Sequence, residues 1–206
     1  MNTTAILAVA AIGFAVSAVS GYFLIPYLHK LHFGQTILDI GPSWHKNKQG
    51  TPTMGGFMFI FAILIASVVG YFMLSQGKND LWHGTQVEIA RYWGTILLAV
   101  SFGIIGFVDD YIKVVKKRNL GLTAIQKLIM QFVAAGLYML ILYTAGDTST
   151  VLIIPFLGQI DLGLVYFPLW VVGIVYITNS VNLTDGLDGL CGSVTCVSAL
   201  GFMMVS

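Results

Sequence analysis

The chain has 206 residues, of which 57% are hydrophobic and only 9% are charged, and its mean hydropathy is +0.85. A water-soluble domain carries about 25% charged residues, so this composition excludes an ordinary soluble protein and favours one that faces lipid. The net charge of +1 gives no reason to expect a nucleic-acid partner. The two cysteines, Cys191 and Cys196, lie in one apolar stretch and lack the spacing of a disulfide framework or a zinc site.

Apolar stretches alternate with short polar segments along the chain. They comprise residues 5–28, a second stretch that ends near Leu74, and then 92–108, 124–145, 164–180 and 190–206. About 20 apolar residues in a helix cross a bilayer. We therefore predict an all-α polytopic membrane protein with about six transmembrane helices, the sixth truncated at Ser206. We see no linker or repeat, so residues 1–206 are expected to form a single membrane domain.

Segment 146–163 has a different pattern. Residues 151–154 are apolar and mostly β-branched, Pro155 and Gly158 can form a turn, and residues 159–162 alternate between polar and apolar. This pattern is typical of a short β-hairpin, and the segment is too short to span a membrane. We predict a small hairpin in an extracytoplasmic loop.

The basic residues are divided unequally between alternate loops. One set of loops, with the start of the fourth helix, contains Lys30, Lys46, Lys48, Lys113, Lys116, Lys117, Arg118 and Lys127. The other set contains only Lys78 and Arg91. Because short loops rich in Lys and Arg stay in the cytosol, we predict an extracytoplasmic N-terminus and a cytosolic face that carries every polar motif described below.

Two adjacent carboxylates, Asp109 and Asp110, end the third apolar stretch, and a basic cluster follows them. Neighbouring carboxylates repel each other and resist desolvation, so they need a cation. One interpretation is a metal ion that handles phosphate together with the basic residues. The alternative is a charged helix end, in which Lys113 forms i,i+4 and i,i+3 ion pairs with Asp109 and Asp110.

Two further polar motifs fall on the same predicted face. Asn182, Asp185 and Asp188 have i, i+3, i+6 spacing, which would place them on one side of a helix. The segment Gly50-Thr51-Pro52-Thr53-Met54-Gly55-Gly56 is rich in residues that allow sharp turns or close approach to a ligand, although a plain loop would have a similar composition.

Three motifs in chain order resemble one known family. They are Gly41-Pro42 with His45, Lys48 and Gly50–Gly56; Gly106-Phe107-Val108-Asp109-Asp110-Tyr111 with Lys113; and Asn182-Leu183-Thr184-Asp185-Gly186-Leu187-Asp188-Gly189-Leu190. The chain resembles the phospho-N-acetylmuramoyl-pentapeptide-transferases, which are part of the polyprenyl-phosphate N-acetylhexosamine-1-phosphate transferase superfamily.

The resemblance implies a Mg²⁺-dependent enzyme of the bacterial inner membrane, with ten membrane helices and often a homodimer. Such an enzyme moves phospho-MurNAc-pentapeptide from UDP-MurNAc-pentapeptide to undecaprenyl phosphate, giving lipid I for the cell wall and UMP. The resemblance implies that Asp109 and Asp110 bind Mg²⁺ and act in catalysis, and that Asp185 also binds the metal. The expected substrate-binding residues are Lys48, Thr53, Lys117, Asn182, Asp185 and Asp188. Family members are longer and have a third metal-binding Asp and a His-rich loop beyond Ser206, so the chain resembles an N-terminal portion.

Our mechanistic hypothesis gives Asp109 the role of accepting or orienting the proton of undecaprenyl phosphate, with Asp110 in the metal shell. It requires Asp109 and Asp185 to converge on one cytosolic pocket. Direct attack by the lipid phosphate and a covalent Asp intermediate both stay open. Two other functions also stay open: a cation-coupled transporter, whose acids would lie near the middle of the membrane, and an inactive fragment of the transferase.

Overall fold

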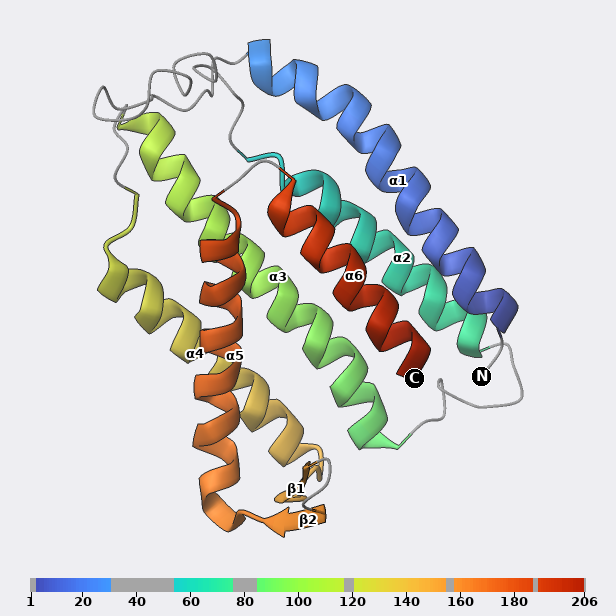
Figure 1. The fold of residues 1–206 in the computed structure, drawn as a ribbon, viewed down its shortest axis with the longest axis vertical. Helices are drawn as coiled ribbons and strands as arrows, with labels where there is room; N and C mark the ends of the chain where they lie inside the picture. Colours follow the sequence, from blue (N-terminus) through green and yellow to red (C-terminus); the bar gives the residue numbers. More distant parts are fainter. Residues whose placement is uncertain are drawn as a thin grey trace. The chain divides into compact units, whose positions relative to one another are not determined.

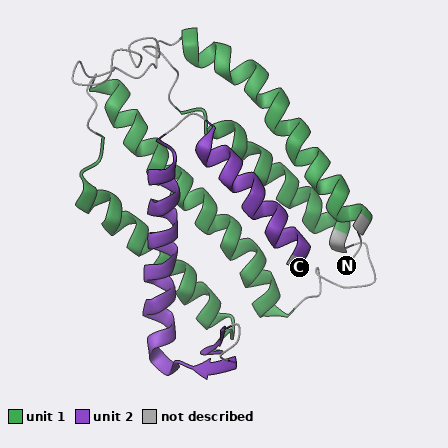
Figure 2. Ribbon diagram, viewed as in Figure 1, with its two compact units in different colours: residues 1–148 green, residues 149–206 purple. Residues whose placement is uncertain are grey.

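The computed structural model describes residues 3–30, 54–75, 85–116, 121–154, 158–186 and 189–205. The chain forms two compact units, Met1–Thr148 and Ser149–Ser206 (Figure 2). The predicted Lys48, Thr53, Lys117 and Asp188 lie outside the described residues. The expectation of one membrane domain stays a prediction, and the two units are described separately.

The first unit contains four helices: α1 (Thr3–Lys30), α2 (Phe57–Ser75), α3 (Gln86–Val115) and α4 (Ala124–Thr144) (Figure 1). Helix α1 packs along α2, and α3 packs along α4, whereas α2 and α3 contact each other over a shorter length. The second unit contains β1 (Val151–Ile154), β2 (Gly158–Asp161), a single 3₁₀ turn over Gly163–Val165, α5 (Tyr166–Thr184) and α6 (Leu190–Val205).

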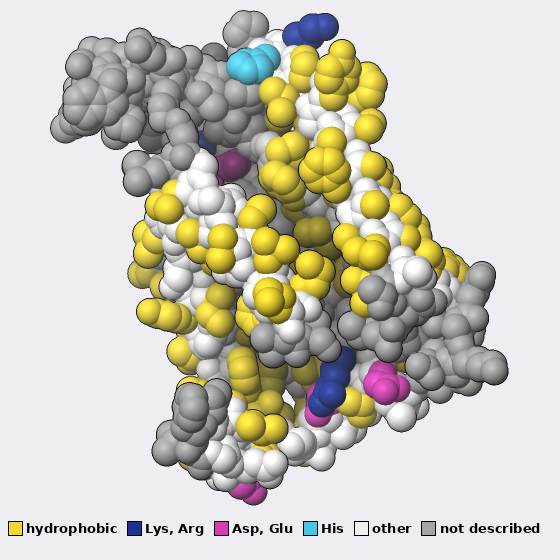
Figure 3. Space-filling model, turned by 45° about the vertical axis from the view of Figure 1, so that its right-hand side comes forward, with side chains coloured by type: hydrophobic (Ala, Val, Ile, Leu, Met, Phe, Trp, Pro, Cys, Tyr) yellow, Lys and Arg dark blue, Asp and Glu magenta, His cyan; other side chains and the backbone are white. Residues whose placement is uncertain are grey.

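The helices have the length and the outer surface of membrane spans. Among the described residues, α1, α3, α4 and the segment Gly163–Thr184 are long and apolar enough to cross a bilayer, and α2 and α6 supply shorter apolar helices. Large side chains such as Phe14 and Leu137 are exposed, and the visible face is mainly hydrophobic (Figure 3). A soluble protein rarely exposes so large an apolar area. The predicted all-α polytopic membrane protein is confirmed.

Small residues let the helices of the first unit approach closely. A Cβ atom at Gly13 of α1 would lie 3.5 Å from the Cβ of Ala66 in α2. A Cβ atom at Gly94 of α3 would lie only 3.3 Å from the ring of Tyr138 in α4. Lipid tails are as apolar as the helices, so close van der Waals packing of this kind holds membrane helices together.

Polar side chains set the first residues of α3 and α4. Thr85 and Glu88 form a reciprocal capping box at the start of α3, and Thr123 and Gln126 form another at the start of α4. Such boxes satisfy backbone N–H groups that have no partner within the helix. Helix α3 extends beyond the predicted 92–108 at both ends. The capping box adds residues at its start, and the charged turns that follow the apolar stretch stay helical as far as Val115.

The predicted hairpin is present in the second unit. Strands β1 and β2 pair antiparallel, with Val151 opposite Asp161 and Ile154 opposite Gly158. The Asp161 carboxylate accepts hydrogen bonds from the Thr150 hydroxyl and the Gly163 backbone N–H, which fixes the turn from the sheet into α5.

Candidate functional site

The two adjacent carboxylates lie in the last two turns of α3 and share one lysine. The Nζ atom of Lys113 is 2.6 Å from Oδ2 of Asp109 and 3.0 Å from Oδ1 of Asp110. Both ion pairs of the charged-helix-end interpretation are therefore present. They do not exclude phosphate chemistry, because a lysine held between two carboxylates can also meet a phosphate.

Asp109 uses its other oxygen to hold the chain that enters α4. The backbone N–H of Leu122 donates a hydrogen bond of 2.8 Å to Oδ1 of Asp109, and the Asp109 side chain is only 15% exposed. Lys127, in the first turns of α4, adds another positive charge near this carboxylate. Both oxygens of Asp109 thus have a protein partner.

The neighbouring Gly121 allows this contact. A Cβ atom at position 121 would lie 2.6 Å from the backbone oxygen of Asp109 and 2.8 Å from its Cγ, and these separations are too short for any real Cβ atom. The connection before α4 therefore passes against α3 at a place where only glycine fits without a shift of the backbone.

Asp110 differs from Asp109 in both exposure and contacts. Its side chain is 33% exposed, and its Oδ1 meets Lys113. Its Oδ2 makes no hydrogen bond or ion pair with another described residue. Among the described residues, a ligand could therefore bind Oδ2 of Asp110 without displacing another protein group, whereas a ligand at Asp109 would have to displace one.

Aromatic side chains cluster toward both ends of the α2–α3 pair. Tyr71 packs against Tyr92 and Trp93 toward one end of the α2–α3 pair, and Phe107 packs against Tyr111 toward the other. An α-helix rises about 28 Å between residues 92 and 111, which is close to the thickness of the hydrocarbon core, about 30 Å. Tyr and Trp collect at membrane interfaces, so this geometry favours an interfacial position for the carboxylates over one in the middle of the membrane.

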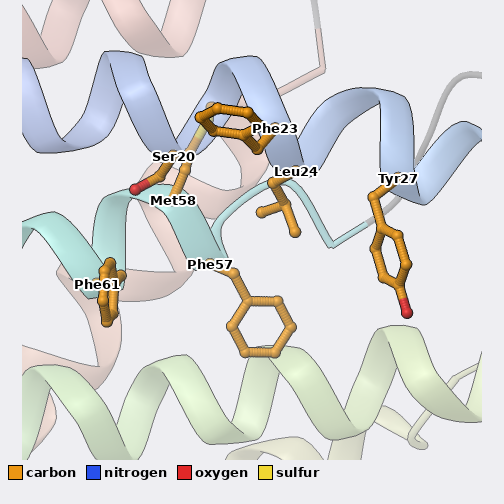
Figure 4. A pocket seen from close by; sticks show the side chains of 7 residues that line it. All are labelled: Ser20, Phe23, Leu24, Tyr27, Phe57, Met58 and Phe61. Carbon is orange, nitrogen blue, oxygen red and sulfur yellow. The ribbon is translucent and has the colours of Figure 1, made fainter.

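An apolar groove runs beside the carboxylate end of α3. Its first part has a volume of about 500 Å³ and is shown in Figure 4. This part is lined by Ser20, Phe23, Leu24, Tyr27, Phe57, Met58 and Phe61. Its second part shares Phe57 and Phe61 and continues between α2 and α3 as far as Phe107. Phe107 precedes Asp110 by one helical turn, so an apolar chain in the groove would end close to that carboxylate.

The second predicted cluster lies at the end of α5, in the other compact unit. Asn182 is in the last turn of α5, and Asp185 is its C-cap residue, whose backbone N–H donates to the carbonyl of Val181 at 3.2 Å. Because α5 ends at Thr184 and α6 begins at Leu190, residues 182–188 do not form one continuous helix. The prediction that Asn182 and Asp185 lie within one helix is wrong, because α5 ends before Asp185, whereas the position of Asp188 stays a prediction.

The described residues bring together only part of the predicted site. Asp109 and Asp110 are adjacent to Lys113, whereas Asp185 belongs to the other unit, so their convergence stays a prediction. No group of three or more His, Cys, Asp or Glu side chains that could hold a metal occurs in the described ranges. Sequence reasoning missed Gly121 and Leu122, although the capping signal at Thr123 marked where α4 begins.

Comparison with known proteins finds similarity over most of the chain. A family model described as "Glycosyl transferase family 4" matches residues 92–206, which is more than half of the sequence. This region includes both the carboxylate pair of α3 and the polar residues at the end of α5.

Several curated relatives carry the name phospho-N-acetylmuramoyl-pentapeptide-transferase. The relative from Halalkalibacterium halodurans is 40% identical over 195 residues, and the match covers 95% of this chain and 57% of the relative. The relative from Clostridioides difficile is 39% identical, with 99% and 59% covered. The relative from Clostridium perfringens is 44% identical, with 89% and 52% covered. The chain thus spans somewhat more than half the length of these relatives.

Proposed function

The chain belongs to glycosyl transferase family 4, and on this basis we propose that it acts in the transfer of phospho-MurNAc-pentapeptide from UDP-MurNAc-pentapeptide to undecaprenyl phosphate. The products are lipid I and UMP, so the reaction serves bacterial peptidoglycan synthesis and, through it, cell shape and division. The names of the relatives support this choice of substrates. The proposal places the protein in the bacterial inner membrane, as a homodimer, with the carboxylate end of α3 in the cytosol.

The observation that carries the proposal is a carboxylate pair, with basic residues around it, at the interfacial end of a membrane helix. Asp109 and Asp110 adjoin Lys113, and Lys116 is exposed at the end of the same helix. A transferase that joins a soluble nucleotide to a lipid phosphate needs such charges at the membrane boundary, where both substrates can arrive. A transporter site would instead lie near the middle of the bilayer.

The apolar groove supports the lipid half of the reaction. Undecaprenyl phosphate combines a long hydrocarbon chain with a charged phosphate, and the groove along α2 and α3 ends at Phe107, beside the charged turn of α3. A lipid that lies in this groove places its phosphate near Lys113 and Asp110. Lysine ammonium groups attract phosphate through charge-assisted hydrogen bonds.

The side chains at this end of α3 fit Mg²⁺ by the chemistry of their donors. That ion usually binds one or two carboxylates and keeps several waters or phosphate oxygens as its other ligands. Asp110 would hold it, with Asp109 beside it and Asp185 as the predicted donor from α5. When bound, Mg²⁺ neutralises charge on the diphosphate and on the leaving UMP.

The protein's own residues then bind and orient the two phosphates. Lys113 offers its ammonium group beside both carboxylates of the pair. The pair accepts the proton of undecaprenyl phosphate or orients this phosphate for attack. We further propose that Lys48, Thr53 and Lys117, with Asn182, Asp185 and Asp188, bind the nucleotide and the sugar phosphate.

The test uses the protein as its gene encodes it, reconstituted in nanodiscs that contain undecaprenyl phosphate and Mg²⁺. With fluorescent UDP-MurNAc-pentapeptide, we expect labelled lipid I on a thin-layer chromatogram and release of UMP in equal amounts. Asp110→Asn should lower the rate at least about 100-fold, because the substitution removes a carboxylate charge that the proposal places next to the reacting phosphates. Chelation of divalent ions should stop the reaction.

A matched control is Asp147→Asn at the other end of α4, where Asp147 forms an ion pair with Arg91 at 2.7 Å. This variant should stay within about twofold of the wild-type rate, because Asp147 lies at the end of the α3–α4 pair opposite the carboxylate pair and its partner Arg91 is largely exposed to solvent, where an ion pair contributes little. The proposal is wrong if the folded wild-type protein forms no lipid I, or if Asp110→Asn keeps a near-normal rate.

A further inference from the structure

We infer that the β-hairpin and the 3₁₀ turn after it form an interfacial membrane anchor, which lies in the lipid headgroup layer and fixes the depth of α5 in the bilayer. The partner that this surface fits is lipid, and not another protein chain. The anchor is independent of the proposed transfer reaction.

The hairpin is attached firmly to the start of a membrane span. Strand β2 ends at Asp161, and a segment long and apolar enough to cross a bilayer begins at Gly163. The backbone N–H of Leu162 donates to the Thr150 carbonyl at 3.0 Å. The backbone N–H of Gly163 donates to the Asp161 carboxylate at 2.9 Å. These bonds close the base of the hairpin, so the hairpin stays next to the boundary at which the span begins.

The side chains exposed in this region are mostly apolar. Ile153 of β1 is 70% exposed, and Leu164 of the 3₁₀ turn is 86% exposed. Further exposed apolar side chains here are Val151, Ile160 and Val165. Asp161 is the only Asp, Glu, Lys, Arg or His from residue 149 to residue 166, and its carboxylate is engaged in the hairpin base. Hairpins that face water commonly carry charges at their edges, especially Lys, so this composition favours contact with lipid.

An aromatic cluster marks the depth of the first turn of α5. The ring of Tyr166 lies 5.7 Å from that of Phe167 and 6.0 Å from that of Trp170, measured between ring centroids. Tyr and Trp collect at the boundary between headgroups and hydrocarbon. Because Leu164 directly precedes this cluster, the 3₁₀ turn and the hairpin reach the headgroup side of that boundary.

The backbone of the hairpin restricts how deep it can lie. In the described part of the chain the sheet has two strands, so each strand has an outer edge whose N–H and C=O groups have no strand partner. Hydrocarbon cannot satisfy such groups, whereas headgroups and their water can. Each polar layer of a bilayer is about 5–7 Å thick, which suits a hairpin that turns aside from the axis of α5 (Figure 1). Apolar side chains at this depth reach toward the acyl chains, as those of interfacial helices do.

A partner protein that added a strand to the hairpin would also satisfy one of these edges. Such a strand would cover the edge of the sheet but not the exposed Leu164, which belongs to the 3₁₀ turn beyond β2. Lipid covers both, because the turn and the hairpin adjoin the same span.

An anchor at the start of α5 sets the depth of its other end. Helix α5 rises about 27 Å from Tyr166 to Thr184, which is close to the hydrocarbon thickness of about 30 Å. With Tyr166 held at one boundary, the C-cap residue Asp185 reaches the opposite boundary. The hairpin therefore fixes the level at which the polar residues at the end of α5 meet water.

The first experiment measures the depth of Ile153 in the protein reconstituted in vesicles of phosphatidylethanolamine and phosphatidylglycerol. In a background with Cys191 and Cys196 replaced by Ser, Ile153→Cys carries a nitroxide label. Collisions of the label with oxygen, which concentrates in hydrocarbon, and with a water-soluble nickel complex then report its depth. Labels at Leu169→Cys in α5 and Lys116→Cys serve as the hydrocarbon and aqueous references, because both native side chains are exposed.

The Ile153 label should lie between the two references, within about 7 Å of the lipid phosphates. Nickel accessibility equal to that of the Lys116 label would place the hairpin in water and rule out the anchor. Low accessibility to both reagents would mean that another protein chain covers the hairpin, and would rule out the anchor as well.

The second experiment places the label at Leu183→Cys, an exposed position in the last turn of α5. The change Ile153→Glu combined with Leu164→Glu should move this label deeper, because the start of α5 is no longer held at its boundary. Gln159→Glu is the matched control: Gln159 is opposite Ile153 in the sheet, is also exposed and is already polar. It should leave the label in place. An unchanged depth at Leu183 in the double variant, with α5 amides still protected from hydrogen exchange, would contradict the anchoring role.

Discussion

At the scale of single residues, the atoms that surround a glycine determine whether a larger side chain can replace it. Gly94 and Gly121 lie where an added Cβ atom would meet another helix or the backbone of Asp109. Gly106 and Gly136, on the same pair of helices, have no neighbouring atom within 4 Å of an added Cβ. Glycines within one helix pair are therefore expected to differ sharply in how well they tolerate substitution by larger residues.

Gly94→Leu should destabilise the α3–α4 pair, because Gly94 is buried and the Tyr138 ring would lie 3.3 Å from even a single Cβ atom. Overpacking of this kind costs about 1–3 kcal/mol. A lower midpoint temperature of unfolding in detergent, followed by the fluorescence of the protein, would report the change. Gly136→Leu is the control, since its side chain would enter open space. Equal midpoints for the two variants would contradict this account of the packing.

At the scale of elements, polar side chains determine where helices and strands begin and end. Capping boxes start α3 and α4, and Asp161 joins the β-hairpin to α5 through the Thr150 hydroxyl and the Gly163 N–H. These hydrogen bonds favour the ionised form, chiefly the bond from Thr150, so the pKa of Asp161 lies below its usual range. The turn into α5 is thus linked to pH.

The direction of this link follows from the lowered pKa. A carboxyl group whose pKa is lower in the folded state stabilises that state above its unfolded pKa of about 3.9. The contribution disappears as the pH falls through the folded value. We expect Gly163 amide exchange, corrected for its intrinsic pH dependence, to accelerate as the pH falls from about 5 to below the folded pKa. Asp161→Asn should abolish this pH dependence, and persistence of the dependence in that variant would contradict the assignment.

At the scale of the whole molecule, an apolar surface combines with charges at the helix ends. Arg91 binds Asp147 at one end of the α3–α4 pair, and Lys113 binds Asp109 and Asp110 at the other. A membrane-spanning pair with this distribution must present its two ends to different aqueous compartments. The excess of basic residues near Lys113 predicts that this end is cytosolic.

Cysteine labelling in intact cells tests this orientation. In a background with Cys191 and Cys196 replaced by Ser, Lys116→Cys should react with a membrane-impermeant maleimide only after the cells are opened. Thr148→Cys, at the opposite end of the pair, should react in intact cells. Both native side chains are exposed, so access to the reagent is decided by the compartment. The reverse pattern would invert the proposed topology and remove the cytosolic active face.

Much of the fold was predictable because the decisive signals are local. Long apolar runs predicted the helices, and the β-branched run with Pro155 and Gly158 predicted the hairpin. The ion pairs of Lys113 were also foreseeable, because i,i+3 and i,i+4 neighbours on a helix are in reach of each other. The extension of α3 was underestimated, because hydropathy reports the apolar segment and not the charged turns that continue the helix.

The sequence by itself determined that the chain is helical and crosses the membrane, since a lipid-exposed backbone must satisfy its hydrogen bonds within each segment. Only the tertiary structure decided that Asp109 binds Leu122 whereas Asp110 does not. Adjacent identical residues look equivalent in a sequence, but successive side chains of a helix point in different directions. Which of them meets a neighbour depends on how α4 folds back against α3, and hydropathy contains no information about that approach.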